Sequence, residues 1–370
     1  MRILHVINSL ETGGAQRLVA DLLTRTVKET SSQVGVIVFQ DSKNSESYQY
    51  IKNIPEIKFY DLSKGKPSKL YIIKEIRKIS RLYDVVHAHL FPSGYFTAIA
   101  TRGLGKSVYY TEHSTHNRRR NNKYLRNLER LIYSRFVGIV AISEPVRTAL
   151  SEWLKSKKIA KRIVTINNGV ELNKYSEISS WHLTPNLNEA TEPKLKEGQK
   201  AIIMVSRFTA SKDQATVIRA IAQVRHKELI AIFVGDGETI ESHKTLAVEL
   251  GVGDRCCFLG TRGDVPELIR MAFIGVQSSN WEGFGLTAVE MMAGGLPVIV
   301  SDVPGLKDVV KGAGILFPRN DAEALAKELD SLAEDVEKYE AVKKQCVKRA
   351  QQFDISNTAR NYIELYKNQY

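Results

Sequence analysis

The stretch IGVQSSNWEGFGLTAVEMMAGGLPVIVSD, residues 274–302, contains one full repeat of an alternating α/β pattern. IGVQSS is typical of a short buried strand, NWEGFG of a glycine-rich turn, and LTAVEMMAGG of a helix that stops at two glycines. PVIVSD then begins the next strand. Apolar runs of this kind, separated by helix-length segments, predict a parallel sheet that is covered by helices on both faces.

The same alternation occurs in two series along the chain. The strand-like runs of the first are ILHVI, VGVIVF, DVVHAH, SVYYT and GIVAIS, and those of the second are AIIMVSRF, LIAIFVG, RCCFLG, IGVQSS and PVIVSD. Two such series predict two α/β domains, and 370 residues are too many for one ordinary core. A polar segment around residues 174–200 with two prolines predicts a linker, so we place the domains at residues 1–172 and 173–353.

Composition excludes several protein classes. The chain is 43% hydrophobic and 25% charged, as globular proteins are, and it has no run of about 18 uncharged apolar residues to span a membrane. The start, MRILHVINSL, has a strand pattern and lacks the long apolar stretch of a signal peptide. Three cysteines, two of them adjacent, form neither a disulfide framework nor a metal-binding spacing, which favours a reducing cytoplasm.

The opening stretch also carries two carboxylates at points where a ligand could bind. Glu282 stands in the turn, and Glu290 lies about one turn into the helix. Gly283 and Gly285 permit close approach of a ligand to the backbone, and the amides at the helix start form an anion site. Carboxylates beside a phosphate make sense if they accept hydrogen bonds from sugar hydroxyls. The alternative is an ordinary turn acid and an ordinary surface residue of a helix.

Further candidate residues follow other strands. Arg207 and Lys212, in VSRFTASKDQATVIRAI, are two cations at a strand end, which suits a diphosphate but also fits a solvated surface pair. Gly13 and Gly14 lie between the first strand and its helix, although they do not form the GxGxxG fingerprint of dinucleotide-binding proteins. VGDGE, with Gly235, is another glycine-rich strand end that is expected to line the same cleft.

Four histidines follow two strands of the first series. They are His87 and His89 in DVVHAHL, and His113 and His116 in YYTEHSTHN. Imidazoles at strand ends can donate hydrogen bonds or carry protons in a cleft, although a lone histidine there is more often structural. His113 is the best placed of the four. With only histidines and Glu112 nearby, the pattern does not predict a metal site.

The net charge of +12 is confined to the first third of the chain, because residues 1–135 hold 23 Lys and Arg against 11 Asp and Glu. Two amphipathic stretches, residues 64–83 and 116–135, carry most of this excess. Their candidate membrane or acceptor contacts are Lys69, Lys74, Arg77, Lys78, Arg118, Arg119, Arg120, Lys123 and Arg126. Such a surface can lie on anionic lipid headgroups, but two ordinary amphipathic helices would look the same. No nucleic-acid motif is present, so nucleic acid is not an expected partner.

Taken in order, these motifs resemble the retaining glycosyltransferases of family 4, which have the two-domain GT-B architecture. The resemblance runs over most of the chain: Gly13-Gly14, DVVHAH, TEH, VAIS, INNGV, SRFTASKD, VGDGE, FLG and EGFGLTAVE. It implies two Rossmann-like domains that face each other across a cleft, with residues 354–370 returning to pack on the first domain. The segment TEHSTHNRRR is similar to that of enzymes that build bacterial surface polysaccharides.

The resemblance also implies roles for the matching residues. Arg207 and Lys212 would hold the donor's diphosphate. Glu282 would bind hydroxyls of the transferred sugar, Glu290 would bind those of the ribose, and His113 would contact the sugar near its reacting carbon. The catalytic set implied is His113, Glu282, Arg207 and Lys212. The donor-binding set implied is Gly13, Gly14, Arg207, Lys212, Gly235, Gly260, Glu282, Gly283, Phe284, Gly285, Leu286, Thr287 and Glu290.

No metal and no cofactor are expected, because cations and helix dipoles would offset the charge of the leaving diphosphate. INNGV departs from the family pattern, with Asn167 where related sequences often carry proline, and this should alter the loop and not the chemistry.

The expected function is transfer of a sugar from a UDP- or GDP-linked donor to a lipid-linked or surface-polysaccharide glycan at the inner face of the cytoplasmic membrane. Retention requires either a covalent intermediate or front-face attack, and the lack of an evident nucleophile favours the second. Two alternatives stay open. One is a glycosyltransferase with a soluble acceptor, and the other is a non-catalytic or epimerase-like protein that binds nucleotide sugars on the same fold.

Overall fold

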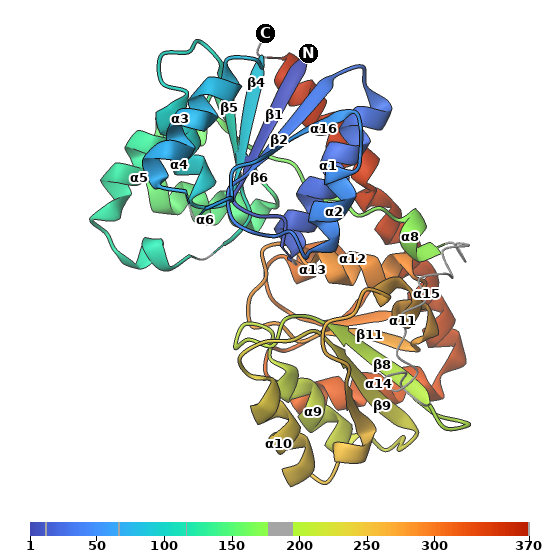
Figure 1. The fold of residues 1–370 in the computed structure, drawn as a ribbon. Coiled ribbons are helices and arrows are strands. Elements are labelled where there is room, and N and C mark those ends of the chain that lie inside the picture. Colours follow the sequence, from blue (N-terminus) through green and yellow to red (C-terminus); the bar gives the residue numbers. More distant parts are fainter. Residues whose placement is uncertain (12, 66, 116, 177–194, 369–370) are drawn as a thin grey trace. The chain divides into compact units, whose positions relative to one another are not determined.

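The computed structural model contains two compact α/β units (Figure 1). It describes all residues except 12, 66, 116, 177–194 and 369–370. The first unit comprises residues 1–169 and 355–370, and the second comprises residues 170–354. Most of the linker predicted around residues 174–200 lies outside the described residues. The predicted boundaries at residues 172 and 353 refer to domains that fold independently. A division into compact units does not test independent folding, so these boundaries stay a prediction.

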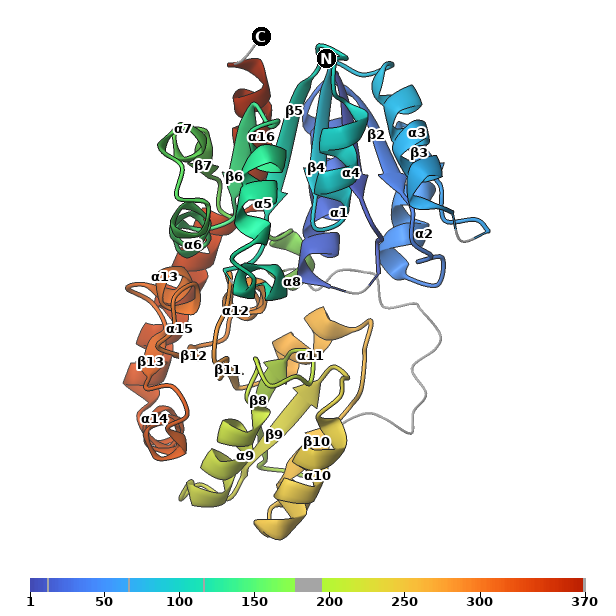
Figure 2. The same cartoon turned by 90° about the vertical axis from the view of Figure 1, so that its left-hand side faces the viewer.

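In the first unit, the described residues form a parallel sheet of seven strands in the order β3-β2-β1-β4-β5-β6-β7. The strands are β1 (Arg2–Ile7), β2 (Gln33–Val38), β3 (Ile57–Asp61), β4 (Val85–His89), β5 (Ser107–Glu112), β6 (Gly138–Ala141) and β7 (Ile163–Thr165). The helices are α1 (Gly14–Glu29), α2 (Glu46–Lys52), α3 (Lys69–Ser80), α4 (Ser93–Ala100), α5 (Leu125–Tyr133), α6 (Glu144–Leu154), α7 (Lys157–Ala160) and α16 (Ile355–Lys367), with a 3-10 turn, η1 (Arg118–Asn121). Figures 1 and 2 show α3, α4 and α5 on one face of the sheet and α1 and α16 on the other.

In the second unit, the described residues form a parallel sheet of six strands in the order β10-β9-β8-β11-β12-β13. The strands are β8 (Lys200–Val205), β9 (Leu229–Val234), β10 (Cys256–Phe258), β11 (Ile274–Gln277), β12 (Val298–Ser301) and β13 (Ile315–Phe317). The helices are α8 (Asn173–Ser176), α9 (Gln214–Gln223), α10 (Ile240–Glu249), α11 (Val265–Met271), α12 (Leu286–Ala293), α13 (Leu306–Val310), α14 (Ala322–Glu334) and α15 (Val336–Ala350), with 3-10 turns η3 (Gly253–Arg255) and η4 (Gln351–Phe353).

The predicted fold class, with two Rossmann-like parallel sheets, is confirmed, and each strand-like run of the sequence forms a strand. The sequence patterns missed β3, β7 and β13. Two of these, β7 and β13, have three residues each, and all three lie at sheet edges, where most of their residues are only partly buried. An edge strand therefore lacks the continuous apolar run that marks a central strand. No helix in the described part of the chain is long and apolar enough to cross a membrane.

Helix α16 completes the core of the first unit although it comes from the other end of the chain. Tyr362 and Tyr366 are buried against the sheet, in a cluster that includes Tyr109. The ring centroids of Tyr109 and Tyr366 are 5.0 Å apart. The crossing into α16 is tight, because a Cβ at Gly169 would lie 2.6 Å from the Cα of Ile355. Glycine is therefore required at residue 169.

Truncating a buried tyrosine of α16 should destabilise the first unit. Tyr362→Ala leaves a cavity between α16 and the sheet, so we expect the free energy of unfolding to fall by about 3–5 kcal/mol. Asn361→Ala, at an exposed neighbouring position, should change it by less than about 0.5 kcal/mol. Urea titration followed by circular dichroism measures both. Equal stability of the two variants would contradict this role of α16.

Candidate active site

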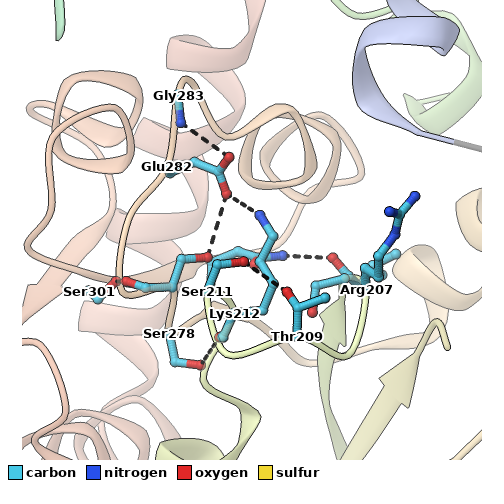
Figure 3. A network of polar contacts seen from close by, with 12 residues as sticks. Arg207, Thr209, Ser211, Lys212, Ser278, Glu282, Gly283 and Ser301 are labelled. Atoms are coloured by element: carbon cyan, nitrogen blue, oxygen red, sulfur yellow. Dashed lines mark hydrogen bonds and ion pairs between the residues drawn. The ribbon is translucent and has the colours of Figure 1, made fainter. Parts of the chain in front are cut away.

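The centre of the candidate site in the second unit is an ion pair between Lys212 and Glu282 (Figure 3). The Lys212 ammonium donates to Oε2 of Glu282, and the amide of Gly283 donates to Oε1 over 3.3 Å. The side chains are 23% exposed for Lys212 and 20% exposed for Glu282. The pair is therefore partly removed from water, which strengthens the attraction, while both groups stay accessible to a ligand.

Two loops that follow neighbouring strands hold this pair in place. Residues 206–213 follow β8 and residues 278–285 follow β11, and the two strands pair directly in the sheet. Ser278 Oγ donates to main-chain carbonyls of the first loop at 2.7 and 3.1 Å. Asn280 donates to the same loop through its main-chain amide at 2.8 Å and its side-chain amide at 2.9 Å. The separation of Lys212 and Glu282 is thus set by the backbone.

Arg207 lies in the same loop as Lys212, but its guanidinium points away from the ion pair (Figure 3). Its main-chain carbonyl accepts a hydrogen bond from Gln214 Nε2 over 3.1 Å, which ties the backbone to the start of α9. The side chain itself is exposed. The structure therefore brings Lys212 and Glu282 together, while the Arg207 guanidinium lies apart from them.

Helix α12 begins at the turn that the sequence predicts as an anion site. Gly285 has a φ of 102°, and a Cβ there would lie 2.6 Å from a leucine side chain, so the position requires glycine. Phe284 is buried and anchors the turn. Leu286 and Thr287 form the first residues of α12, and Glu290, one turn further, is buried at 7% exposure. Glu290 is therefore a buried carboxylate and not a surface residue of an ordinary helix.

The remaining predicted donor residues of the second unit lie at the ends of two further strands. Gly235 follows β9 and Gly260 follows β10, and the amide of Gly235 donates to the Gly260 carbonyl over 2.7 Å. A Cβ at Gly235 would lie 2.1 Å from the carbonyl oxygen of Ser206, which belongs to the loop after β8. The predicted donor residues in this unit are thus supplied by loops at the carboxyl ends of adjacent strands and by the first turns of α12.

In the first unit, Gly13 and Gly14 lie where β1 leads into α1. Gly14 is the first residue of α1 and Gly13 is its N-cap residue. The φ of Gly13 is 172°, an extended conformation that any residue can adopt. A Cβ at Gly13 would lie 2.5 Å from the end of the Gln16 side chain, which can move aside. Backbone geometry alone therefore does not require glycine at residue 13.

His113 directly follows β5, and both of its ring nitrogens are buried without a hydrogen-bond partner among the described residues. Burial lowers the pKa of His113 to about 3. Its imidazole is therefore neutral near pH 7, and it can both donate and accept a hydrogen bond. Unsatisfied buried nitrogens are costly, which makes His113 a candidate for contact with a ligand.

His87 and His89 fit the structural alternative, because both imidazoles are fully buried in the sheet. Nδ1 of His87 lies 2.6 Å from the Tyr366 hydroxyl of α16, and Nε2 lies 2.7 Å from Thr111 Oγ1. The rings of His87 and His89 stack with centroids 4.5 Å apart. Burial lowers the pKa of both histidines, so both imidazoles are uncharged at neutral pH. His116 lies outside the described residues.

The sequence patterns did not indicate a stack of neutral imidazoles, formed by His5 on β1 and by His87 and His89 on β4. His5 Nδ1 lies 3.0 Å from His89 Nε2, and the His89 ring is 5.7 Å from that of His113. The alternation of strand residues could have indicated His5 as a core position, but nothing in the sequence showed that it meets His89. Through these contacts His113 is linked to the interior of the first unit.

Several arginines that the sequence places on a basic surface have partners inside the first unit, which corrects that prediction. Arg119 Nε lies 2.9 Å from an oxygen of the buried Glu129, and Arg120 Nη2 lies 3.0 Å from one of the buried Glu112. Each carboxylate belongs to a different element from its arginine, Glu112 to β5 and Glu129 to α5, so the pairing could not be inferred from the pattern.

Arg77 and Arg126 are likewise engaged within the unit. Arg77 Nη1 donates to two main-chain carbonyls at the end of α4, those of Ala100 at 2.7 Å and Arg102 at 2.8 Å. Arg126 lies over the ring of Trp153, 4.8 Å from its centroid. Arg118 belongs to η1, and its side chain is outside the description.

The lysines of the predicted surface are exposed, as the sequence suggests. On α3 they alternate with exposed apolar side chains, Leu70 at 63% and Tyr71 at 48% exposure. The exposed lysines are Lys69, Lys74, Lys78 and Lys123. Within the described residues, no group of three or more His, Cys, Asp or Glu side chains is arranged to hold a metal ion.

Comparison with known families matches both parts of the chain. Residues 12–174 match the model of Glycosyltransferase Family 4, and residues 187–349 match that of Glycosyl transferases group 1. Together these two segments span most of the chain.

Individual relatives and structures agree with the family matches. An Escherichia coli enzyme, UDP-Gal:alpha-D-GlcNAc-diphosphoundecaprenol alpha-1,3-galactosyltransferase, is 26% identical and covers 74% of this chain and 72% of its own. N-acetyl-alpha-D-glucosaminyl L-malate synthase of Bacillus anthracis is 26% identical over 69% of this chain and 66% of its own. The crystal structure of Anabaena HepE with UDP and glucose is 22% identical, covers all of both chains and has a TM-score of 0.83.

The buried ring nitrogens of His113 predict that its imidazole stays neutral over a wide pH range. Its pKa of about 3 in the folded protein lies below the ordinary value of 6.5, so the stability it contributes is present above about pH 6.5 and is lost as the pH falls toward 3. Histidine Cε1 resonances, assigned with His113→Gln and His226→Gln, report both groups. Between pH 8 and 5 the His113 signal should not move.

His226 is the internal control for this titration, because Glu334 and Glu228 raise the pKa of this half-buried imidazole. Its signal should titrate above pH 6.5. A midpoint for His113 near that of His226 would show that the His113 ring is open to water.

Proposed function

Because the chain belongs to glycosyltransferase family 4, we propose that it transfers a sugar from a nucleoside-diphosphate donor with retention of the anomeric configuration. The observation that carries this proposal is the Lys212–Glu282 ion pair beside the start of α12. A diphosphate needs cations and amide donors, and a sugar needs carboxylates for its hydroxyls. Both kinds of group meet at this sheet edge.

In this proposal the bound donor separates Lys212 from Glu282, and each of these side chains then contacts a different part of the donor. The Lys212 ammonium turns to the diphosphate, and the amides at the start of α12 point at the same anion. Glu282, held by its own backbone contacts, accepts hydrogen bonds from the transferred sugar. Glu290 accepts from the ribose hydroxyls, and Arg207 bends toward the phosphates from the same loop as Lys212. UDP or GDP is the proposed carrier.

The reaction we propose is a front-face substitution at the anomeric carbon. The bond between this carbon and the phosphate oxygen breaks, and the electron pair leaves with the nucleoside diphosphate. The acceptor hydroxyl attacks from the same side and passes its proton to the departing phosphate oxygen. Lys212, Arg207 and the α12 amides stabilise the negative charge that develops there, so we propose that no metal or cofactor is needed.

His113 of the first unit is the group that we assign to the reacting sugar. A neutral imidazole can accept from a sugar hydroxyl at one nitrogen and donate at the other. Gly13 and Gly14 would allow the loop before α1 to approach the diphosphate. The buried ring nitrogens of His113, which have no partner in the described part of the protein, support this assignment.

For the acceptor we propose a lipid-linked or surface-polysaccharide glycan at the inner face of the cytoplasmic membrane. The exposed lysines and apolar side chains of α3 support contact with anionic lipid. The name of the Escherichia coli relative specifies a diphosphoundecaprenol acceptor. A soluble acceptor is the second candidate, because the Bacillus anthracis relative is named for transfer to malate.

Breaking the central ion pair should remove donor binding and turnover. Lys212→Met and Glu282→Gln should each lower turnover by about 100-fold or more, because each removes a group that acts on the reacting donor. Lys338→Met is a matched control, since Lys338 pairs with Glu328 over 2.9 Å at a similar exposure in the same unit. Release of nucleoside diphosphate from a panel of nucleotide sugars, with and without chelator, gives the rates.

Thermal stabilisation by the same panel separates binding from chemistry. A ligand at 100 times its dissociation constant adds about 2.7 kcal/mol to the stability of the wild type and of Lys338→Met. We expect a much smaller shift for Lys212→Met. Stabilisation of all three proteins to the same extent would place the donor elsewhere, and loss of activity on adding chelator would refute metal-free transfer.

The lysines of α3 should contribute to membrane binding. Replacing Lys69 and Lys74 by glutamate should weaken co-sedimentation with phosphatidylglycerol vesicles by more than about tenfold, since each cation contributes about 1 kcal/mol. The charge-matched control replaces Lys344 and Lys348, two exposed lysines of α15. Equal losses in the two double variants would mean that only net charge matters, and the proposed surface on α3 would be withdrawn.

A further inference from the structure

A separate pocket of the first unit lies where α5, the connection from α6 to α7, and the start of β7 meet. Its volume is about 430 Å³. Three cationic residues line it, Arg130 from α5, Lys158 from α7 and Arg162 just before β7, together with Ser134 and Ser156. No carboxylate is among the lining residues. The sequence around it is strongly basic, because residues 155–162, KSKKIAKR, hold five cations and no acid.

Two of these cations are fixed in place by neutral groups. Arg130 Nε and Nη2 donate to the main-chain carbonyls that end α6, at 2.5 and 3.1 Å. Arg162 Nη1 donates to two carbonyls that follow α5, both at 3.1 Å. These bonds position the guanidinium groups without neutralising their charge. Among the described residues, no carboxylate forms an ion pair with Arg130, Lys158 or Arg162.

Capping of helix ends explains only part of this arrangement. Cations near the carboxyl end of a helix are favourable, and this accounts for the contacts of Arg130 and Arg162. It does not account for Lys158, which makes no such bond, nor for the donor atoms of Arg162 that have no partner in the described part of the chain. Three positive charges around one pocket repel each other, and this repulsion is relieved when an anion binds between them.

We propose that this pocket binds a phosphate group. Arginine side chains present a planar set of donors that matches phosphate oxygens, and lysine adds a mobile charge. Ser156 Oγ accepts from the amide of Ile159 over 3.5 Å, so its own proton is available to the anion. The site is distinct from the donor site proposed above, because it lies beside the edge strand β7 of the other unit.

The surroundings of the pocket favour a phospholipid headgroup as the source of the phosphate. Leu131 lines the pocket and is 55% exposed, and Leu128, also on α5, is 48% exposed. Exposed leucines next to a phosphate site suit a lipid surface, where the chains lie beside the headgroup. A free phosphate or a phosphorylated small molecule would use the same cations and would not need the leucines.

Charge reversal at Lys158 tests the pocket with little risk to the fold, because this side chain is exposed and forms no hydrogen bond or ion pair with the described residues. Lys58→Glu is the matched control, since Lys58 is an exposed lysine on β3, at the opposite edge of the same sheet. Lys158→Gln removes the charge without adding a new one. All variants are made in the Lys212→Met background, so that phosphate does not bind at the donor site.

Two probes then identify the source of the phosphate. Inorganic phosphate is titrated against chloride at equal ionic strength, with the melting temperature as readout, and co-sedimentation compares phosphatidylglycerol with phosphatidylcholine vesicles. We expect Lys158→Glu to weaken binding to phosphatidylglycerol vesicles by roughly tenfold or more, and Lys58→Glu to weaken it by less. The stabilisation by phosphate should be lost in Lys158→Glu and retained in Lys58→Glu.

Each outcome decides the question. If Lys158→Glu, but not Lys58→Glu, loses both the stabilisation by phosphate and the binding to vesicles, the pocket is a headgroup site. If Lys158→Glu loses only the stabilisation by phosphate, the pocket is a site for a free phosphate. If Lys158→Glu loses only the binding to vesicles, the pocket binds lipid, and it binds a phosphate group only when that group is part of a membrane surface. Responses to phosphate and to vesicles that are the same in Lys158→Glu and Lys58→Glu would overturn the proposal.

Discussion

The candidate site depends on one constraint, the parallel pairing of β8 with β11 at the centre of the second sheet. Parallel neighbours end at the same edge, so the loops that follow them meet there. Ser278 and Asn280 then join the two loops by hydrogen bonds to main-chain carbonyls. Lys212 and Glu282, far apart in the sequence, are brought together because their backbones have no freedom to separate. The start of α12 and the turn at Gly235 reach the same edge for the same reason.

The position of Lys212 also explains why its partner is a carboxylate. A lysine beside the amides of a helix start is surrounded by positive potential, which is unfavourable for a partly buried cation. Glu282 compensates this charge and at the same time holds the ammonium in one direction. A diphosphate can replace the carboxylate as the partner of Lys212, and the carboxylate is then released for neutral hydroxyls. The Lys212 ammonium therefore has an anionic partner both with and without the proposed donor.

The sequence predicted those features that depend on neighbours along the chain. Central strands, the glycine turn at Gly285 and the positions of Lys212 and Glu282 at strand ends all follow from local patterns. Edge strands such as β7 were missed, because a half-exposed strand has no continuous apolar run. Pairings across the fold were missed as well. Arg119 and Arg120 look like surface cations until Glu129 and Glu112 are found beneath them.

The basic pocket was missed for a similar reason. Residues 1–135 carry the whole net charge, so the rest of the chain has equal numbers of cationic and acidic residues. This equality concealed the run of cations at residues 155–162. Its meaning depends on Arg130, which comes from another helix and lies against the same pocket. A count of charged residues along the sequence includes residues that lie far apart in the folded protein. A binding site depends only on the charged residues that the fold brings close together.

The first unit shows how far such long-range dependence extends. Tyr366, near the end of the chain, contacts His87; His87 stacks on His89, and the ring of His89 lies beside that of His113. His113 therefore sits on a layer of buried, neutral imidazoles that α16 closes from one side. Because residues 355–370 belong to this unit, its core cannot be completed before the second unit has been synthesised. The two units are thus coupled in folding by the path of the chain.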